Sequence, residues 1–419
     1  MDVKRICELI DERQNELYDT LCSLIKINTE NFGNVGCEKE CADYIEELCK
    51  NLGLEVEKYS PLDLPGFIDS PDYFPGRDLE NRFNVTARWH GKSNEDNLML
   101  MGHIDTVPIG DEANWDFSPI AGEVRDGAVW GRGACDDKYA IATVLFLIKL
   151  LKEEGFVPKE NLIFSAYCDE ELGGSHGALA TVLKYPCKSL VNMDGREKQI
   201  WNCASGGQVV YYRYHVNDTV DSAERTAQAF PIVMEEIKKF GERRRTELEN
   251  NRFYRGTAVP GTSLRYNEIR AGNNDMDKGV GVLQFTYYTD RTREEIAEEF
   301  ATLETSLAEK LAPLGITGDG ITPYTRFFHY GFCEPDSEDI QLLIQSSEEV
   351  SGFKPIVCGS CLSDLSIILK YGPKSSVAFG AGYEFSKKGG PHQPNERIEC
   401  ADLLRFAKTI AAYVIKKLG

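Results

Sequence analysis

The 419-residue sequence lacks the segments that would place it in a membrane or on a nucleic acid. Between Met1 and Asn31 there is no positively charged region followed by an apolar run, so we expect no secretion signal. The longest apolar stretch, residues 140–151, is too short to cross a bilayer and contains Lys149. The formal net charge of -20 argues against nucleic acid or an anionic membrane surface as a partner.

The sequence also lacks a disulfide framework, an internal repeat and a low-complexity tract. Its 13 cysteines are scattered along the chain, unlike those of a small disulfide-rich domain, and they suit a reducing cytoplasm better. Cys358-Gly-Ser-Cys361 is a lone Cys-x-x-Cys pair, which is weak evidence for a zinc or redox site. We therefore expect a cytoplasmic protein.

Strands and helices alternate along the first half of the sequence. Short apolar runs typical of strands occupy residues 84–89, 97–101, 161–167 and 189–193. Helical patterns occupy residues 41–52 and 138–154 and recur near 178–183. This alternation predicts an α/β fold with a largely parallel sheet and helices on both of its faces.

The pattern of predicted strands and helices changes at about residue 205. Two strands, 209–216 and 283–289, alternate with two helices, 222–245 and 292–311, and Pro231 is expected to break or kink the first helix. These elements predict a smaller α+β unit that interrupts the α/β domain. The predicted boundaries are 1–204 and 326–419 for the two segments of the α/β domain and 205–325 for the inserted unit.

Several potential metal ligands follow the ends of predicted strands. His103, the run 169–171 and Asp194 each lie there, and the carboxyl ends of parallel strands are where α/β sheets bind ligands. Asp136 and His392 lie in glycine-rich loops. Imidazole and carboxylate groups together suit zinc or a comparable divalent ion.

The carboxylate run Asp169-Glu170-Glu171 allows two interpretations. Its members are either solvated residues at a strand end or parts of a dinuclear metal site. In the second case one glutamate binds metal while its neighbour takes the proton from a metal-bound water. Composition and spacing alone leave both interpretations open.

A competing motif lies in the same stretch. Residues 173–177 match Gly-x-Ser-x-Gly, the nucleophile-elbow pattern of serine hydrolases, with Ser175 at its centre. Asp194 or Asp364 and then His392 would complete a triad in chain order. The elbow needs its serine at the strand-to-helix turn, however, and acidic residues precede Ser175 here and would oppose an oxyanion site. A serine hydrolase that uses Ser175 is therefore the alternative to the metal-dependent hydrolase.

Five motifs in one order resemble a known enzyme family. They are Met101-Gly-His-Ile-Asp-Thr-Val-Pro108, Gly127-Ala-Val-Trp-Gly-Arg-Gly-Ala-Cys-Asp-Asp-Lys138, Asp169-Glu-Glu-Leu-Gly-Gly174, Met193-Asp194 and Pro391-His-Gln-Pro-Asn-Glu396. The chain is similar to the dinuclear-zinc amidohydrolases and peptidases, the family of acetylornithine deacetylase, succinyl-diaminopimelate desuccinylase, aminoacylase-1 and glutamate carboxypeptidase.

The resemblance implies a site for two Zn²⁺ ions, with Co²⁺ or Mn²⁺ as alternatives. The implied ligands are His103 and Asp194 for one metal, Glu171 and His392 for the other, and Asp136 between them. Asp105 would orient His103 from behind.

The resemblance also implies a reaction. A metal-bridging hydroxide would attack the amide carbonyl of an N-acyl amino acid or a small peptide, with Glu170 as general base and proton donor to the leaving amine. A catalytically silent relative that only binds metal or a peptide is a further alternative, although such a relative would not need to keep Glu170.

In this family the inserted unit is a lid that often dimerises, and here the resemblance is incomplete. Family lids carry a histidine after their first strand, but residues 217–222 contain none, so His215 or His329 would have to replace it. Residues 272–279 replace the Asn-x-x-Pro segment that usually follows a lid glycine. Arg291 resembles the family's carboxylate-binding arginine. A homodimer through the lid is the partner that the resemblance implies.

Overall fold

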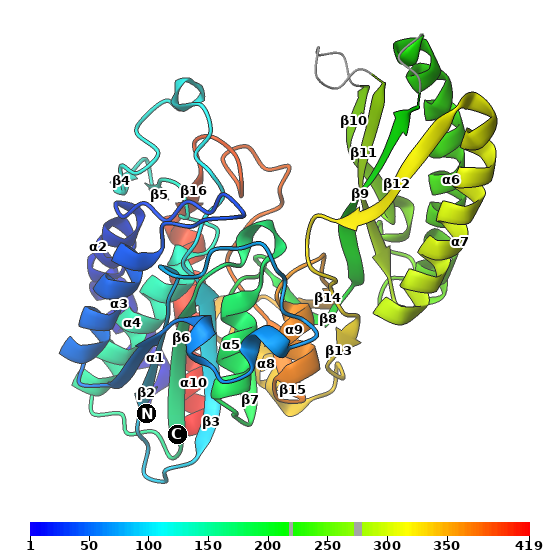
Figure 1. Cartoon of the computed structure of the whole chain (residues 1–419). Helices are drawn as coiled ribbons and strands as arrows, with labels where there is room; N and C mark the ends of the chain where they lie inside the picture. The colour runs from blue at the N-terminus through cyan, green and yellow to red at the C-terminus, as the bar shows by residue number, and fades with distance from the viewer. Residues whose placement is uncertain (218–220, 272–278) are drawn as a thin grey trace. The chain divides into compact units, whose positions relative to one another are not determined.

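The fold is described from a computed structural model that covers residues 1–217, 221–271 and 279–419. The chain forms two compact units. The first comprises Met1–Asn202, Phe332–Cys358 and Ile367–Gly419, and the second comprises Cys203–Gly331 with Gly359–Ser366. Figure 1 shows the elements of both.

A nine-stranded mixed sheet organises the first unit. Its main path runs β1-β2-β6-β3-β7-β15-β8-β13, and β14 pairs with β8. The bounds are β1 Glu55–Tyr59, β2 Asn84–Trp89, β6 Asn161–Tyr167, β3 Asp96–His103, β7 Ser189–Asn192, β15 Ser375–Ala378, β8 Gln199–Ala204, β13 Gly331–Phe332 and β14 Ile356–Gly359. The four central strands β6, β3, β7 and β15 are parallel, which confirms the expected α/β fold class.

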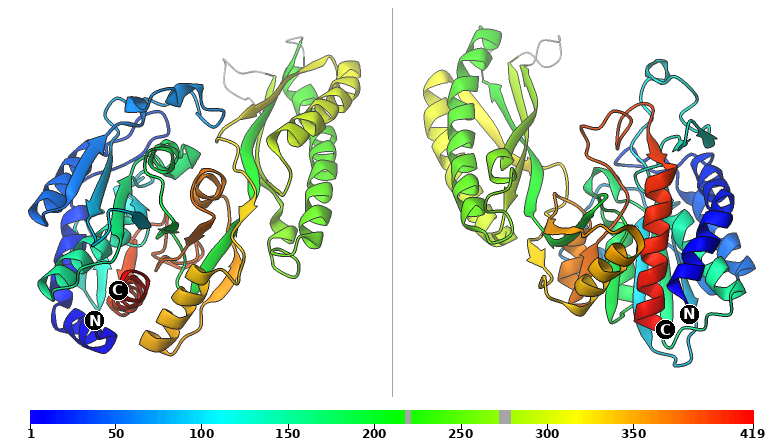
Figure 2. Two further views of the ribbon diagram at one scale, coloured as in Figure 1. Left: turned by 90° about the horizontal axis from the view of Figure 1, so that it is seen from below. Right: turned by 180° about the vertical axis from the view of Figure 1, so that it is seen from behind.

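Helices cover both faces of this sheet because its central strands are apolar on both sides. One face carries α1 Val3–Glu12, α2 Gln14–Ile25, α3 Lys39–Asn51, α4 Lys138–Glu153, α8 Glu338–Ser351 and α10 Cys400–Leu418. The other carries α5 His176–Lys184 and α9 Leu365–Tyr371. In β3, Leu98 and Leu100 pack on the first face, whereas Met99 and Met101 pack on the second. Figure 2 shows α10 beside α1 and α8.

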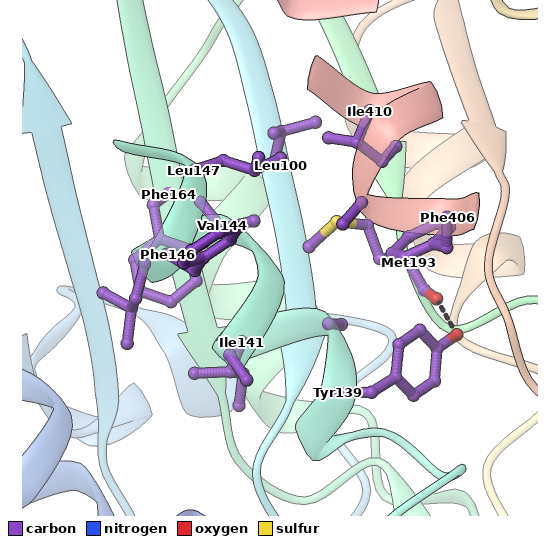
Figure 3. Close-up of a cluster of buried hydrophobic side chains, with 14 of the residues drawn as sticks. Leu100, Tyr139, Ile141, Val144, Phe146, Leu147, Phe164, Met193, Phe406 and Ile410 are labelled. Atoms are coloured by element: carbon purple, nitrogen blue, oxygen red, sulfur yellow. Dashed lines mark hydrogen bonds between the residues drawn. The ribbon is translucent and has the colours of Figure 1, made fainter. Parts of the chain in front are cut away.

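Helix α4 is the central element of the larger core. It is apolar around most of its circumference and buries Ile141, Val144 and Leu147 against the sheet and α10 (Figure 3). Tyr139, in its first turn, donates a hydrogen bond of 2.6 Å from its hydroxyl to the backbone oxygen of Met193. That bond fixes the chain at the residue before Asp194, and so connects the core to the strand ends.

The second unit is a four-stranded antiparallel sheet with two long helices, as expected for an α+β unit. The strand order is β10-β11-β9-β12, with bounds β10 Leu264–Ala271, β11 Val280–Thr289, β9 Gly206–Val216 and β12 Ile316–Pro323. Helices α6 Ser222–Asn250 and α7 Arg293–Leu311 share one core with β9 and β11. Thr292 and Glu295 cap α7 reciprocally.

Some elements differ from the sequence-based expectation. The predicted helix does not end at Pro231, because α6 runs from Ser222 to Asn250 with Pro231 inside it, and the kink stays a prediction. Strands β10 and β12 were not predicted, because β10 is a half-exposed edge strand with charged residues and β12 has a register shift between Gly318 and Gly320. No helix in the described part of the chain combines the length and apolarity needed to cross a bilayer.

Candidate metal centre

Parallel pairing brings three of the expected ligand positions to one edge of the central sheet. In β3 and β6, His103 pairs with Tyr167, so the run that begins at Cys168 leaves the sheet beside His103. In β3 and β7, Met101 pairs with Asn192, which places Asp194 level with His103 on the neighbouring strand. The sheet register thus explains why residues far apart in sequence meet here.

A small antiparallel sheet brings the other two ligand positions together. Its strands are β4 Glu123–Arg125, β5 Ala128–Trp130 and β16 Arg397–Glu399, in the order β16-β5-β4. Arg397 pairs with Trp130, so the loop that contains His392 lies beside the loop that contains Asp136. Within these loops the backbone nitrogen of Cys135 donates to Oε1 of Glu396 over 3.0 Å.

The carboxylate of Asp136 is the centre of the cluster. Its Oδ1 lies 3.1 Å from Nε2 of His103, and its Oδ2 lies 3.3 Å from Nε2 of His392. Oε2 of Glu171 lies 3.0 Å from the same nitrogen of His392. The candidate ligand atoms of His103, Asp136 and Glu171 all lie within 4.8 Å of one another. Each oxygen of one carboxylate therefore faces a different imidazole, the arrangement that a carboxylate bridging two metal ions requires.

The imidazole of His103 contacts a backbone group of Asp105. Its Nδ1 lies 2.8 Å from the backbone oxygen of Asp105, whereas the nearest carboxylate oxygen of Asp105 is 3.7 Å away. Since Nδ1–H donates to that carbonyl, Nε2, which faces Asp136, is the nitrogen that could bind a metal ion. Asp105 therefore contacts His103 mainly through its carbonyl, and its role in orienting His103 stays a prediction.

The carboxylate of Asp105 holds the peptide of the two glutamates instead. Its Oδ1 accepts the backbone N–H of Glu170 over 3.1 Å, and its Oδ2 accepts that of Glu171 over 2.9 Å. The carboxylate of Glu171 is further fixed by the backbone N–H of Val107, which donates to Oε1 over 3.2 Å. The Glu170 side chain is partly exposed.

The charges of the cluster shift the pKa values of its members. Burial alone would lower the pKa of His392, but the charge of Glu171 and the hydrogen bonds to Asp136 and Glu171 outweigh it and raise the pKa to about 11. The pKa of His103 is also raised, because Asp136 and Glu170 outweigh the effect of its burial. Both imidazoles carry protons that a pair of divalent ions would replace, and the donor set thus fits such ions.

Asp137 follows Asp136 in the sequence and supports the backbone of His103. Its side chain is buried, and its Oδ2 accepts the backbone N–H of His103 over 3.3 Å. Burial and the charges of Asp194 and Asp136 raise the pKa of Asp137 well above its ordinary value. Through its hydrogen bond with His103, Asp137 supports the strand end that carries His103.

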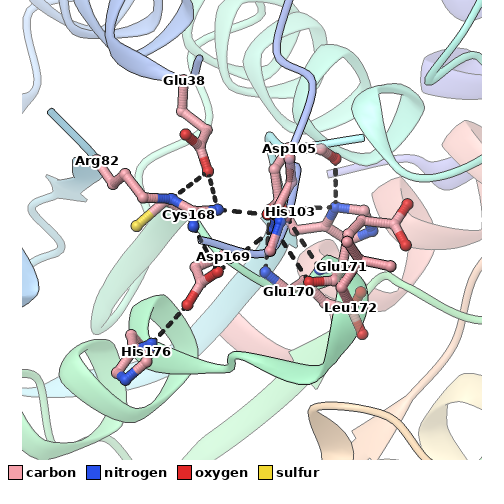
Figure 4. A network of polar contacts seen from close by, with 12 residues as sticks. Glu38, Arg82, His103, Asp105, Cys168, Asp169, Glu170, Glu171, Leu172 and His176 are labelled. Carbon is pink, nitrogen blue, oxygen red and sulfur yellow. Dashed lines mark hydrogen bonds and ion pairs between the residues drawn. The ribbon is translucent and has the colours of Figure 1, made fainter. Parts of the chain in front are cut away.

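Asp169, the first member of the carboxylate run, lies in a buried ionic network behind the cluster (Figure 4). Its carboxylate lies 2.8 Å from Nη1 of Arg77, 2.7 Å from Nη1 of Arg82 and 2.5 Å from Nδ1 of His176. Burial alone would raise the pKa of Asp169, but Arg82 and His176 lower it to about 2. Arg82 also pairs with the buried Glu38 over 2.8 Å.

The two arginines and Glu38 in this network carried no signal in the sequence. Isolated arginines and a lone glutamate in a helical pattern match no site motif, and their partners lie 44 to 92 residues away along the chain. The same holds for Asn31, whose buried side chain reaches both Asp105 and Asp169.

Ser175 does not form a nucleophile elbow. The residue is 1% exposed, and its backbone N–H donates to the backbone oxygen of Asp169 over 2.6 Å. The neighbouring imidazole of His176 is engaged by Asp169. Burial without access for a substrate argues against nucleophilic catalysis by Ser175.

The predicted substrate-binding residues belong to the second unit, whereas the metal cluster belongs to the first. Nε of Arg291 lies 2.5 Å from Glu247, and 45% of the arginine side chain is exposed. Nδ1 of His215 in β9 lies 2.8 Å from Oδ1 of Asp319 in β12, and both side chains are about half exposed. His329 lies near Arg293, and its ring packs on Phe327. Both segments that depart from the family pattern, 217–222 and 272–279, are described only in part, because residues 218–220 and 272–278 lie outside the described chain.

The α/β fold and its histidine–carboxylate cluster define the chain as one of the metallohydrolases. It belongs to peptidase family M20/M25/M40, whose family model matches residues 99–416. The resemblance stated from the motifs is thereby confirmed, and the comparisons give no support to a serine hydrolase.

Two relatives illustrate the similarity in sequence. An uncharacterised metallohydrolase of Methanococcus maripaludis is 33% identical over 172 residues, which cover 39% of this chain and 38% of that protein. Succinyl-diaminopimelate desuccinylase of Wigglesworthia glossinidia brevipalpis is 26% identical over 254 residues, which cover 59% of this chain and 57% of the relative. The matches therefore span less than two thirds of these relatives.

Two solved structures show the same fold over almost the whole chain. Human carnosine dipeptidase 1 superposes with a TM-score of 0.73 at 14% identity and covers 99% of this chain and 98% of its own. A dinuclear metal-binding M20 peptidase of Bacillus subtilis has a TM-score of 0.60 at 15% identity, with 96% and 97% covered. Metal dependence is a property of this family.

Proposed function

We propose that the protein hydrolyses the amide bond of an N-acyl amino acid or a short peptide, and that it does so with two divalent metal ions. The observation that carries this proposal is the carboxylate of Asp136, whose two oxygens face the Nε2 atoms of His103 and His392. The names of the relatives support the reaction class, since they include a desuccinylase and a dipeptidase.

The five ligands divide into two sets around Asp136. His103 and Asp194 would hold one ion, and Glu171 and His392 would hold the other. When bound, the ions supply a Lewis acid for the amide carbonyl and lower the pKa of a water molecule. Zinc suits the nitrogen and oxygen donors, with cobalt or manganese as alternatives.

Glu170 is the proposed general base and acid. Its backbone is fixed by Asp105 while its side chain stays partly exposed, so its carboxylate is held near the cluster and remains accessible to a substrate. It would take a proton from the attacking water on one carboxylate oxygen and deliver it to the leaving amine. Its charge contributes to the raised pKa of His103, which supports its closeness to the site.

The second unit would serve as a lid that binds the substrate and pairs with a second copy of the chain. In this proposal Arg291 leaves its ion pair with Glu247 to bind a substrate carboxylate, a suitable role for an exposed guanidinium. Either His215 or His329 would replace the missing lid histidine near the oxyanion. The boundaries 1–204, 205–325 and 326–419 separate catalytic and lid functions in this proposal.

The cytoplasm is the proposed location. The 13 cysteines lie in the described residues, and all of them are free thiols. A chain with so many unpaired thiols suits a reducing compartment.

A substrate screen tests the reaction class. N-acetyl and N-succinyl amino acids and dipeptides would be offered to the protein loaded with zinc, cobalt or manganese. We expect the protein to hydrolyse at least one of these amides. A chelator should abolish this activity and added metal should restore it, and the Ser175→Ala variant should keep the activity. Metal binding without hydrolysis of any amide would favour the catalytically silent alternative, and loss of activity in Ser175→Ala with an unchanged fold would favour the serine hydrolase.

A further inference from the structure

The side chain of Asn31 joins three groups behind the metal cluster. Its Nδ2 donates to Oδ2 of Asp105 over 2.8 Å, to the backbone oxygen of Glu171 over 3.0 Å and to Oδ1 of Asp169 over 3.3 Å. Its own Oδ1 accepts the backbone N–H of Gly33 over 2.9 Å, and the residue is fully buried. One amide therefore connects the ends of β3 and β6 to the N-terminal segment.

These contacts fix the peptide that carries the proposed base and a proposed ligand. Asp105 holds Glu171 by its backbone N–H, and Asn31 holds the same residue by its backbone oxygen. The N–H of Glu170 is held by the other oxygen of Asp105. Because the backbone N–H and oxygen of Glu171 are both held, the starting point of its side chain is fixed. Its carboxylate is thereby directed towards His392.

The charges around Asn31 explain why an uncharged donor stands there. Asp105 and Asp169 are both buried and would repel each other in a medium of low dielectric constant. Arg82 is 2.7 Å from Asp169, but its Nη2 is 4.0 Å from Asp105, so it compensates the two carboxylates unequally. The amide of Asn31 supplies a close donor to Asp105 without adding a charge.

We propose that Asn31 is a positioning residue for the metal centre, which it serves by holding the backbone of Glu171 and the carboxylate of Asp105 together. Asn31 touches neither a substrate nor a reacting atom and acts through these residues. The proposal rests on the proposed function for its effect on turnover, but its effect on metal binding can be measured without any turnover.

The test compares Asn31→Ala with Asn34→Ala. Asn34 lies in the same segment and is exposed, so its substitution controls for the loss of an asparagine there. Zinc bound per chain would be measured over free zinc concentrations set by a chelator buffer, and kcat and KM would be measured on the best substrate of the screen. Thermal unfolding of the metal-free proteins would report the fold.

We expect folded Asn31→Ala to bind at least one zinc ion about 10- to 100-fold more weakly than wild type, the usual effect of removing a group that orients a ligand. Its kcat should fall by a similar factor with KM within about threefold. Asn34→Ala should match the wild type in all three. Asn31→Ser, which keeps a shorter donor, should lie between the wild type and Asn31→Ala.

Unchanged zinc affinity in folded Asn31→Ala would overturn the proposal. So would the unfolding of both Asn31 variants, because the residue would then hold the fold and not the site. Weaker zinc binding in a protein whose wild type hydrolyses no amide would support the positioning role and reject the proposed function.

Discussion

Arg132 and Glu396, which lie 264 positions apart along the chain, form a buried ion pair with 2.6 Å between Nη1 and Oε2. The pair joins the loop of Asp136 to the loop of His392. Glu396 also accepts the backbone N–H of Cys135, the residue before Asp136. The two ligand loops are thus held together by one carboxylate.

Arg132→Met should destabilise the protein strongly. It leaves Glu396 buried without its cation, and removing one member of a buried ion pair costs about 3–5 kcal/mol. Urea unfolding of the metal-free protein measures the change. Arg125→Met removes an exposed arginine from the same small sheet and should cost no more than about 1 kcal/mol. Equal effects of the two substitutions would contradict the structural role of the pair.

Metal binding should release protons at neutral pH. The pKa of His392 is raised to about 11 and that of His103 is raised above its ordinary value, so both imidazoles carry protons in the metal-free protein. Apparent metal affinity should therefore increase with pH through the neutral range, because the protons that the metal displaces are released into a solution of lower proton concentration. Calorimetry in buffers of different ionisation enthalpy counts the protons, and about two per chain are expected. No proton release would contradict the assigned protonation.

Glu38→Gln should change how stability depends on pH. Burial raises the pKa of Glu38 to about 7 even though Arg82 opposes the shift. Because the carboxyl pKa is higher in the folded than in the unfolded protein, protonated Glu38 stabilises the folded state. This stabilisation is complete below the pKa of the unfolded chain and is lost as the pH rises towards 7. The free energy of unfolding of wild type minus that of Glu38→Gln should fall by up to about 3 kcal/mol between pH 4.5 and 8. A difference that stays constant or rises would show that the pKa is not raised.

His392→Ala should weaken metal binding far more than His90→Ala. His392 faces both Asp136 and Glu171, whereas His90 is exposed and paired only with Glu55 among the described residues. Zinc content after dialysis should drop towards one ion per chain in His392→Ala and stay at two in His90→Ala. The same zinc content in both variants would remove His392 from the ligand set.

The proposed ligands that follow strand ends were open to prediction from the sequence. His103, Glu171 and Asp194 follow apolar runs, and parallel strands place such residues at one sheet edge. Asp136 and His392 lie in loops, where their residue types and glycine-rich surroundings suggested ligands, and the family motifs indicated which metal each would hold. The sequence did not indicate that the carboxylate of Asp105 accepts the backbone N–H groups of Glu170 and Glu171.

The residues that hold the proposed site residues in place could not be predicted from sequence patterns. Asn31 and Arg82 gain their roles from partners 74 and 44 residues away, respectively, and neither belongs to a motif. Pro231 shows the opposite case, in which a strong local signal for a break is overridden, because residues on both sides of it pack into one core.

The most direct test of the account is the activity of Glu170→Ala at full metal loading. The side chain of Glu170 is the proposed proton carrier and is not one of the proposed ligands. We expect two metal ions per chain, as in the wild type, and a kcat on the best amide substrate reduced by at least about 10²-fold. A variant that keeps both metals and hydrolyses the amide at the wild-type rate would contradict the central claim.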